Sequence, residues 1–386
     1  MLKEEIEQRI KTFQRALKER NLKGALLFSP INIFYFTSLF IKGFLFIGEE
    51  EVGLYVKRPY QWAKGSSFLP VFPLDSLKIL PEVLTKKGIR EVGVDFRALN
   101  FEEGKKIEGL LSSFELISLD DLVWECRKRK SDFEIVCMKR AAQKLSSALK
   151  KSIKLFKLGM KEITASALLE RALRESGHPG FTRSYNNFEL TYGYLISGKE
   201  GLFALPYATG EGGKGVEGFP GGATFKKLRK GEPILIDFSG FYKGYYVDQT
   251  RMASFGRCKS AESFFNITLE ILKHLEKMGK PGIPAEELYF HAEAIVEKHG
   301  VREYFMCHGE RLKFIGHGVG LEIDEPPVIA PKNKIPLQEN MVLALEPKFH
   351  LPWLGVVGLE DTFLVTKKGL RRLTTFPREW IYLGGG

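Results

Sequence analysis

Two aspartates in neighbouring apolar runs are the first residues whose spacing could support chemistry. Asp237 and Asp248 each follow a run of apolar residues, and two glycines lie between them. If the runs form a hairpin in which the carboxylates face each other, the turn is centred between Tyr242 and Lys243. Buried neighbouring carboxylates repel each other and need a cation to stay ionised. The pair therefore indicates a metal site, with solvent-facing aspartates at strand ends as the alternative interpretation.

Three further residues could complete such a site. His317 is flanked by glycines, which let the backbone come close to whatever the imidazole touches. Glu346 and Glu360 each lie within an apolar, strand-like run, where an uncompensated charge would be costly. A lone histidine or one edge glutamate could be purely structural. The whole set of four carboxylates and one imidazole instead matches the charge of two divalent cations.

The apolar patterning predicts two domains, 1–125 and 126–386. In the first, Ile6, Ile10 and Phe13 follow helical spacing and predict a surface helix. Strand-like runs then alternate with helical segments, which is typical of a small α/β domain. The predicted strands are 25–29, 33–37, 44–48, 51–56 and 91–95, and the predicted helices are 80–87 and 101–111.

The second domain mixes helices with mostly antiparallel strands, which predicts an α+β fold. The helices are expected at about 132–159, 161–176, 261–278 and 284–299. The strands are expected at 191–197, 233–238, 245–250, 341–349 and 359–366.

Composition argues against two partner classes. The chain has 386 residues and 58 Lys and Arg against 47 Asp and Glu, but its basic residues are scattered. The densest basic run, 127–130, is followed by acidic residues and is best explained as a solvated connector, so no nucleic-acid partner is expected. The apolar stretch 24–48 is interrupted by Pro30, Asn32 and Lys42, which predicts short strands and no membrane span. The four cysteines form no metal or CxxC spacing, as expected of reduced thiols in a cytoplasmic protein.

The order of the five candidate ligands resembles the metallopeptidase family of methionine aminopeptidase, Xaa-Pro aminopeptidase and prolidase. They stand within IDFSG…VDQTR, GHGVGLE…EPP, LEP and LEDT. The resemblance covers residues 130–374, and the leading domain is similar to the creatinase-type N-terminal domain of the prolidase branch. It implies an α+β pita-bread catalytic domain over 126–386, preceded by a smaller α/β creatinase-type domain over 1–125.

The resemblance also implies cofactors and an activity. It assigns two divalent ions per chain, manganese or cobalt first and zinc or iron as options, to Asp237, Asp248, His317, Glu346 and Glu360. A hydroxide bridging the ions would attack an amide carbonyl, with Glu346 and His317 as catalytic residues and Glu346 moving a proton. Oxygen-rich ligation with one imidazole suits such ions. The expected substrate is a small peptide or another small amide, and a homodimer is expected.

Several residues near the expected substrate depart from this family. Asp324 stands seven residues after His317, where active Xaa-Pro members have a second histidine. Tyr207 stands where a Pro-His pair is expected, Lys313 precedes His317 by four residues, and Gly358 replaces an arginine found in many members. We therefore expect Tyr207, Lys313 and Asp324 to line a changed substrate site in which Asp324 favours a cationic group.

These departures leave three functions open. The protein could cleave Xaa-Pro peptides, hydrolyse a non-prolyl or non-peptide C–N bond, or act as a non-catalytic pita-bread binding module. The complete ligand set favours hydrolysis, because clustered carboxylates without a metal would destabilise the fold. His308 and His350 could either be structural or reach the site, and the glycine-rich segment 210–218 is expected to form a lid loop.

Overall fold

The computed structural model describes residues 2–186, 189–205, 212–308 and 310–384. Two compact units divide the chain, Met1–Arg127 and Lys128–Gly386. Within the described residues, no helix has the length and apolar character needed to cross a membrane.

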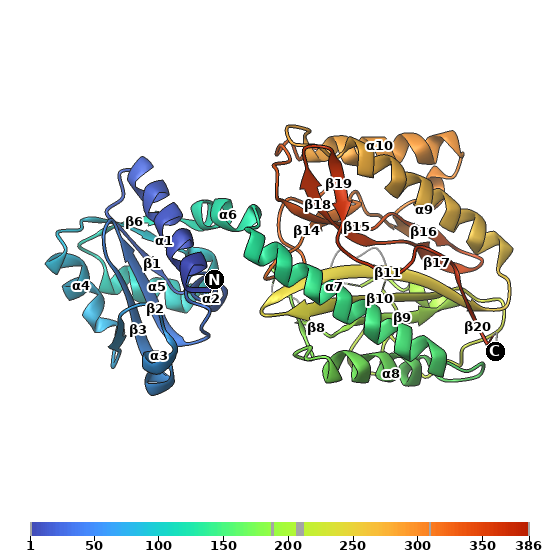
Figure 1. Cartoon of the computed structure of the whole chain (residues 1–386), viewed down its shortest axis with the longest axis horizontal. Helices are drawn as coiled ribbons and strands as arrows, with labels where there is room; N and C mark the ends of the chain where they lie inside the picture. Colours follow the sequence, from blue (N-terminus) through green and yellow to red (C-terminus); the bar gives the residue numbers. More distant parts are fainter. Residues whose placement is uncertain (1, 187–188, 206–211, 309, 385–386) are drawn as a thin grey trace. The chain divides into compact units, whose positions relative to one another are not determined.

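The first unit is built on a six-stranded mixed sheet with the strand order β4-β3-β2-β1-β5-β6 (Figure 1). Its strands are β1 (Gly24–Leu27), β2 (Lys42–Gly48), β3 (Val52–Arg58), β4 (Val71–Pro73), β5 (Glu91–Val94) and β6 (Glu115–Ser118). Its helices are α1 (Leu2–Glu19), α2 (Pro30–Thr37), α3 (Tyr60–Ser66), α4 (Leu80–Lys86), α5 (Phe101–Leu110) and α6 (Asp120–Lys128), with short 3-10 turns at Leu77–Ile79 and Phe96–Ala98.

Most predicted elements of this unit are confirmed. The helical face of α1 is buried at Ile6, Ile10 and Phe13, as its spacing predicted. The predicted strand at 33–37 is wrong, because this segment belongs to α2. Ser29 caps that helix by accepting a hydrogen bond from the Asn32 N–H, and a proline occupies its first turn. Local capping therefore overrides the β-propensity of the apolar run.

The second unit contains two four-stranded sheets, β20-β11-β10-β9 and β14-β15-β18-β19. Its strands are β7 (Thr182–Arg183), β8 (Glu189–Leu190), β9 (Gly193–Ser197), β10 (Ile234–Tyr242), β11 (Tyr245–Phe255), β12 (Cys307–His308), β13 (Glu310–Arg311), β14 (Gly316–Gly318), β15 (Val342–Leu345), β16 (Lys348–Leu351), β17 (Gly355–Gly358), β18 (Asp361–Thr366), β19 (Gly369–Arg372) and β20 (Ile381–Leu383). Its helices are α7 (Asp132–Ser152), α8 (Glu162–Glu175), α9 (Lys259–Met278) and α10 (Ala285–Lys298), with 3-10 turns at Ile153–Leu155, Gly198–Leu202 and Arg302–Tyr304.

Helices cover both sheets of this unit. α7 packs against β10 and β11 and α8 against β9, while α9 packs against β17 and β19 and α10 lies on α9 (Figure 1). Leu272, Leu288, Leu343 and Phe363 are completely buried in the hydrophobic core of this unit. The four predicted helices are confirmed, although α7 ends at Ser152 and not near 159.

The turn of the β10–β11 hairpin lies one residue later in the chain than it would if the carboxylates of Asp237 and Asp248 faced each other. Tyr242 pairs with Tyr245, so the turn consists of Lys243 and Gly244. Both residues have positive φ angles, 48° and 93°, as a two-residue hairpin loop matching the strand twist requires. Backbone geometry at this loop therefore sets the register of both aspartates.

Candidate metal centre

The two aspartates do not face each other, so the facing arrangement considered for the hairpin does not occur. Asp237 pairs with Thr250, and Asp248 pairs with Ser239. Because Asp237 and Ser239 are two residues apart in a strand, they point to the same face, and so does Asp248. The carboxylates are diagonal neighbours on one face of the β10–β11 hairpin.

A break between two aligned strand pairs positions the glutamates. The β15–β18 pairing ends where Leu345 lies opposite Asp361. The β16–β17 pairing begins in the same register, with Lys348 opposite Gly358. Glu346 therefore lies opposite Glu360 inside the break. The Glu346 N–H donates to the Ile315 carbonyl at 2.8 Å, and the Glu360 N–H donates to the Thr250 carbonyl of β11 at 3.3 Å. This last bond joins the second sheet to the hairpin that carries the aspartates.

Three of the predicted ligands converge closely. Asp248, His317 and Glu360 each offer one ligand atom, and these atoms lie within 4.8 Å of one another. The His317 Nδ1 lies 3.1 Å from the Gly318 carbonyl. Nδ1 must carry the proton to donate there, so Nε2 presents a lone pair to the site.

Glu360 has a carboxylate oxygen that is available to bind a cation. Its Oε2 accepts a hydrogen bond from the Thr250 hydroxyl at 2.8 Å. Its Oε1 is buried and has no hydrogen-bond partner in the described part of the chain. A buried carboxylate oxygen without a partner is costly unless a cation satisfies it, so Glu360 fits the role of a metal ligand beside Asp248 and His317.

Lys348 is the residue at this site that the sequence prediction missed. Its side chain is completely buried, and its ammonium lies 3.0 Å from Asp237 Oδ2 and 2.6 Å from Glu346 Oε2. Glu360 Oε2 is 4.0 Å away. The available signal was its position two residues after Glu346 within the predicted strand 341–349, a spacing that would place both side chains on one face.

Burial and mutual repulsion dominate the electrostatics of the centre. Loss of solvation raises the pKa of Asp248 and of Glu360 well above the ordinary carboxyl range. The nearby carboxylates of Asp237 and Glu346 raise both pKa values further, and the Lys348 ammonium lowers them. The protein alone therefore does not compensate these acids fully, and an added cation would be stabilising.

The residues present fit one divalent ion and do not fit two. Asp248, His317 and Glu360 converge, and one Glu360 oxygen has no hydrogen-bond partner among the described residues. By contrast, one oxygen each of Asp237 and Glu346 is already occupied by the Lys348 ammonium. A second ion at Asp237 and Glu346 would have to share these two carboxylates with the ammonium.

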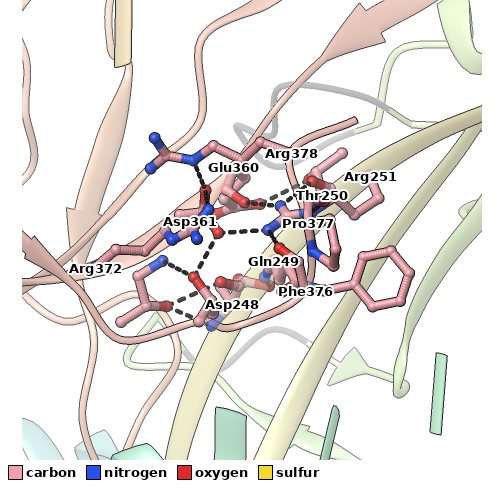
Figure 2. Close-up of polar contacts among 12 residues, drawn as sticks. Asp248, Gln249, Thr250, Arg251, Glu360, Asp361, Arg372, Phe376, Pro377 and Arg378 are labelled. Atoms are coloured by element: carbon pink, nitrogen blue, oxygen red, sulfur yellow. Dashed lines mark hydrogen bonds and ion pairs between the residues drawn. The ribbon is translucent and has the colours of Figure 1, made fainter. Parts of the chain in front are cut away.

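A buried ion-pair network lies beside the centre and holds Glu360 (Figure 2). Arg251 is fully buried, and its Nη2 lies 2.7 Å from Asp361 Oδ1. Its Nη1 donates to the Glu360 carbonyl at 2.7 Å, and Arg378 also pairs with Asp361. Figure 2 shows these groups converging on Asp361, one residue from Glu360. The network fixes the backbone from which the Glu360 carboxylate projects.

The carboxylates of Asp237, Asp248 and Glu346 open onto a cavity of about 280 Å³. One part of its lining is polar: Asp237, Asp248, His317, Glu346 and Asp324. Another part is apolar, and includes Phe314, Ile323, Val328 and Tyr194. A small ligand with a polar reacting bond and an apolar group would match this lining.

The three predicted substrate residues have different placements. Asp324 lines the cavity, and its carboxylate accepts hydrogen bonds from the Ser184 hydroxyl at 2.8 Å and the Asn186 amide at 2.9 Å. Lys313 is exposed, and the lining does not include it. Tyr207 lies outside the described residues.

A serine and a histidine also meet beside the cavity. His178 Nε2 lies 3.1 Å from Ser239 Oγ. However, His178 Nδ1 accepts from the Gly180 N–H, so Nε2 carries the proton and donates to the serine. A histidine that donates to Ser239 is not a base for it, and this pair does not form a nucleophile.

Two other sequence features are placed only in part. His350 is buried in β16, and the cavity lining does not include it. The side chain of His308 and the first residues of the 210–218 segment lie outside the described part of the chain. The lid function of that segment stays a prediction.

Comparisons with known proteins find relatives for both units of the chain. Residues 136–367 match the model of metallopeptidase family M24, and residues 9–129 match the creatinase/prolidase N-terminal domain. The chain is 28% identical to an Xaa-Pro dipeptidase of Pyrococcus furiosus over 97% of this chain and 99% of that protein.

Solved structures similar to this chain also include prolidases and Xaa-Pro dipeptidases. The prolidase from Pyrococcus horikoshii has a TM-score of 0.81 and 26% identity, covering 97% of this chain and 100% of that one. An Xaa-Pro dipeptidase from Bacillus anthracis has a TM-score of 0.83 and 25% identity, covering 98% and 100%.

Proposed function

The chain belongs to metallopeptidase family M24, and from this premise we propose that it cleaves Xaa-Pro dipeptides or similarly short peptides. Membership confirms the predicted fold class, a pita-bread domain preceded by a creatinase-type N-terminal domain. It also confirms the predicted enzyme class, a metal-dependent hydrolase of an amide C–N bond. The alternative of a non-catalytic binding module is therefore not favoured.

One observation carries the substrate proposal: the cavity combines the carboxylate and imidazole cluster with an apolar wall. A bound dipeptide would place its amide bond near Glu346 and His317 and its apolar side chain or ring against Phe314 and Val328. The volume of about 280 Å³ suits a dipeptide better than a long chain. The similar proteins are named Xaa-Pro dipeptidase and prolidase, which supports proline as the residue whose ring contacts the apolar wall.

We assign the metal to Asp248, His317 and Glu360, and propose manganese or cobalt, with zinc and iron to be compared. Their donor set of two carboxylates and one imidazole suits these ions. When bound, a divalent ion there would polarise the amide carbonyl and make water a stronger nucleophile at neutral pH.

Glu346 is the proposed proton carrier. Lys348 donates to its Oε2, while its Oε1 lies 3.5 Å from His317 Nε2 on the side of the cluster. With one oxygen held and the residue lining the cavity, Glu346 can take a proton from the attacking water and pass it to the leaving nitrogen. Asp324 is proposed to attract the positively charged amino group or side chain of the substrate.

The test is a substrate screen on the full chain after loading with each metal. Xaa-Pro dipeptides and tripeptides are compared with non-prolyl dipeptides and with cyclic or guanidino C–N compounds. Hydrolysis is expected for the proline dipeptides and lost in Asp248→Asn. Activity confined to non-peptide substrates, or equal activity in Asp248→Asn, would contradict the proposal. In Asp324→Asn, a KM that rises more for substrates with a basic side chain than for neutral ones would support the role of Asp324.

The predicted homodimer and cytoplasmic location stay proposals. The dimer is tested by light scattering on protein eluting from a sizing column. A monomeric mass across the working concentration range would contradict it.

A further inference from the structure

We propose that the Lys348 ammonium takes the place of one of the two expected metal ions, beside Asp237 and Glu346. Each chain then binds one divalent ion and not two. The ion would occupy the position surrounded by Asp248, His317 and Glu360. The inference rests on the proposed metal site, but it does not depend on which peptide is the substrate.

The first support is the position of the ammonium. Lys348 Nζ lies between Asp237 Oδ2 and Glu346 Oε2, at 3.0 and 2.6 Å, and these are charge-assisted hydrogen-bond distances. A divalent ion held by the same oxygens would bind them at about 2.0 to 2.6 Å. It would then lie close to Nζ in a site shielded from water, where like charges repel strongly. The ammonium and a second ion therefore compete for one position.

The second support is the uneven hydrogen bonding of the carboxylates. Glu346 and Asp237 each have an oxygen satisfied by Lys348. Among the described residues Glu360 Oε1 is buried and has no hydrogen-bond partner, and the Glu360 side chain lies beside Asp248 and His317. The centre thus has one half that the protein completes by itself and one half that still needs a cation.

The third support is that Lys348 has no room to leave. Its side chain is 0% exposed, and every residue of β16 is buried. The backbone at this position is anchored on both sides, because the Met306 N–H donates to the Lys348 carbonyl at 2.9 Å and Lys348 pairs with Gly358 across the hairpin. A lysine that could swing into water would be displaced by a metal, whereas this one is enclosed.

Charge balance is compatible with one ion. A divalent ion and one ammonium supply three positive charges to the four carboxylates of Asp237, Asp248, Glu346 and Glu360. Near-balance matters because an uncompensated buried charge strongly destabilises the folded state. Lys348 therefore takes over part of the role that a second metal would have.

The experiment counts ions on the full chain, purified without a metal-affinity tag, stripped with a chelator and reloaded with Mn²⁺. Elemental mass spectrometry and titration calorimetry are expected to give about one ion per chain for the wild type. Lys348→Met and Lys348→Gln remove the charge at similar length and are expected to bind about two. Lys367→Met, which removes an exposed lysine directly after β18, should leave the count at one.

Electron paramagnetic resonance of the Mn²⁺ protein gives a readout independent of activity. The wild type should show the six-line spectrum of an isolated ion, and Lys348→Met should show the broadened spectrum of a coupled pair. His317→Ala keeps Lys348 intact and avoids any folding defect caused by its loss. If one site exists, this variant loses all bound metal; a remaining full equivalent overturns the inference.

The outcomes separate the two proposals. Two ions in the wild type overturn the role of Lys348 and leave the metallopeptidase function standing. No ion in the wild type overturns the Asp248–His317–Glu360 site, and the single-ion inference with it. One ion in the wild type that is lost in His317→Ala supports both the Asp248–His317–Glu360 site and the single-ion inference.

Discussion

Gly358 lies directly across the β16–β17 hairpin from Lys348, and a Cβ on Gly358 would come within 2.4 Å of Lys348 Cγ. The contact involves the first part of the lysine stem, which cannot move aside as easily as a flexible chain end. A side chain at 358 and a lysine at 348 are therefore mutually exclusive in this geometry. The cation beside Asp237 and Glu346 is supplied by β16, and β17 makes room for it.

Gly358→Ala should destabilise the second unit. The new methyl group overlaps the buried stem of Lys348, and overpacking of this kind costs about 1 to 3 kcal/mol. Urea unfolding measures the loss. In the double variant with Lys348→Ala the stem is gone, so the added methyl group should cost clearly less than it does in the wild type. Additive effects in the double variant would show that the two residues do not conflict.

Arg251→Met should destabilise the protein strongly and weaken metal binding. It leaves the buried Asp361 without its 2.7 Å partner and removes the donor to the Glu360 carbonyl. Breaking a buried pair typically costs about 3 to 5 kcal/mol. Arg372→Met is the matched control, since Arg372 is one-third exposed and lies 3.9 Å from the same carboxylate. Its expected cost is below about 1 kcal/mol, and equal effects of the two variants would contradict this account.

The ligand candidates could be recognised from sequence because each is a charged or polar residue inside an otherwise apolar strand. Burial of Asp237 or Glu360 requires compensation, and that requirement is visible without a structure. The break that places Glu346 opposite Glu360 also has a local cause, since Pro347 has no N–H to continue the ladder.

Lys348 was missed because its importance depends on a residue far along the chain. A lysine two positions after a glutamate looks like an ordinary surface alternation until Gly358 is known to lie opposite and leave it space. The hairpin register was missed for a related reason: the positive φ of Lys243 is set by strand twist, and residue type gives little warning of it. At 33–37, capping by Ser29 outweighed strand propensity.

His178 should make stability depend on pH. Burial, and then the positive charge of Arg174, lower the pKa of His178 to about 4. The folded state therefore binds fewer protons than the unfolded state between pH 4 and the ordinary histidine value near 6.5, so stability falls as the pH falls through this window. The loss reaches about 3 kcal/mol at most. Urea unfolding from pH 7 to 4 should show a shallower slope in His178→Gln, and parallel curves would contradict the assignment.

Glu346→Gln should separate catalysis from metal binding. The glutamine carbonyl can still accept the hydrogen bond from Lys348, so the local structure should persist, but an amide cannot take up a proton from water. We expect kcat to fall by about 10² to 10⁴ while the protein still binds its ion through Asp248, His317 and Glu360. Asp248→Asn should lose both activity and metal. Metal content and kcat are measured on the same preparations. If Glu346→Gln loses its ion as completely as Asp248→Asn does, Glu346 is a required metal ligand. The proposal that Lys348 and a single metal ion share the centre is then wrong.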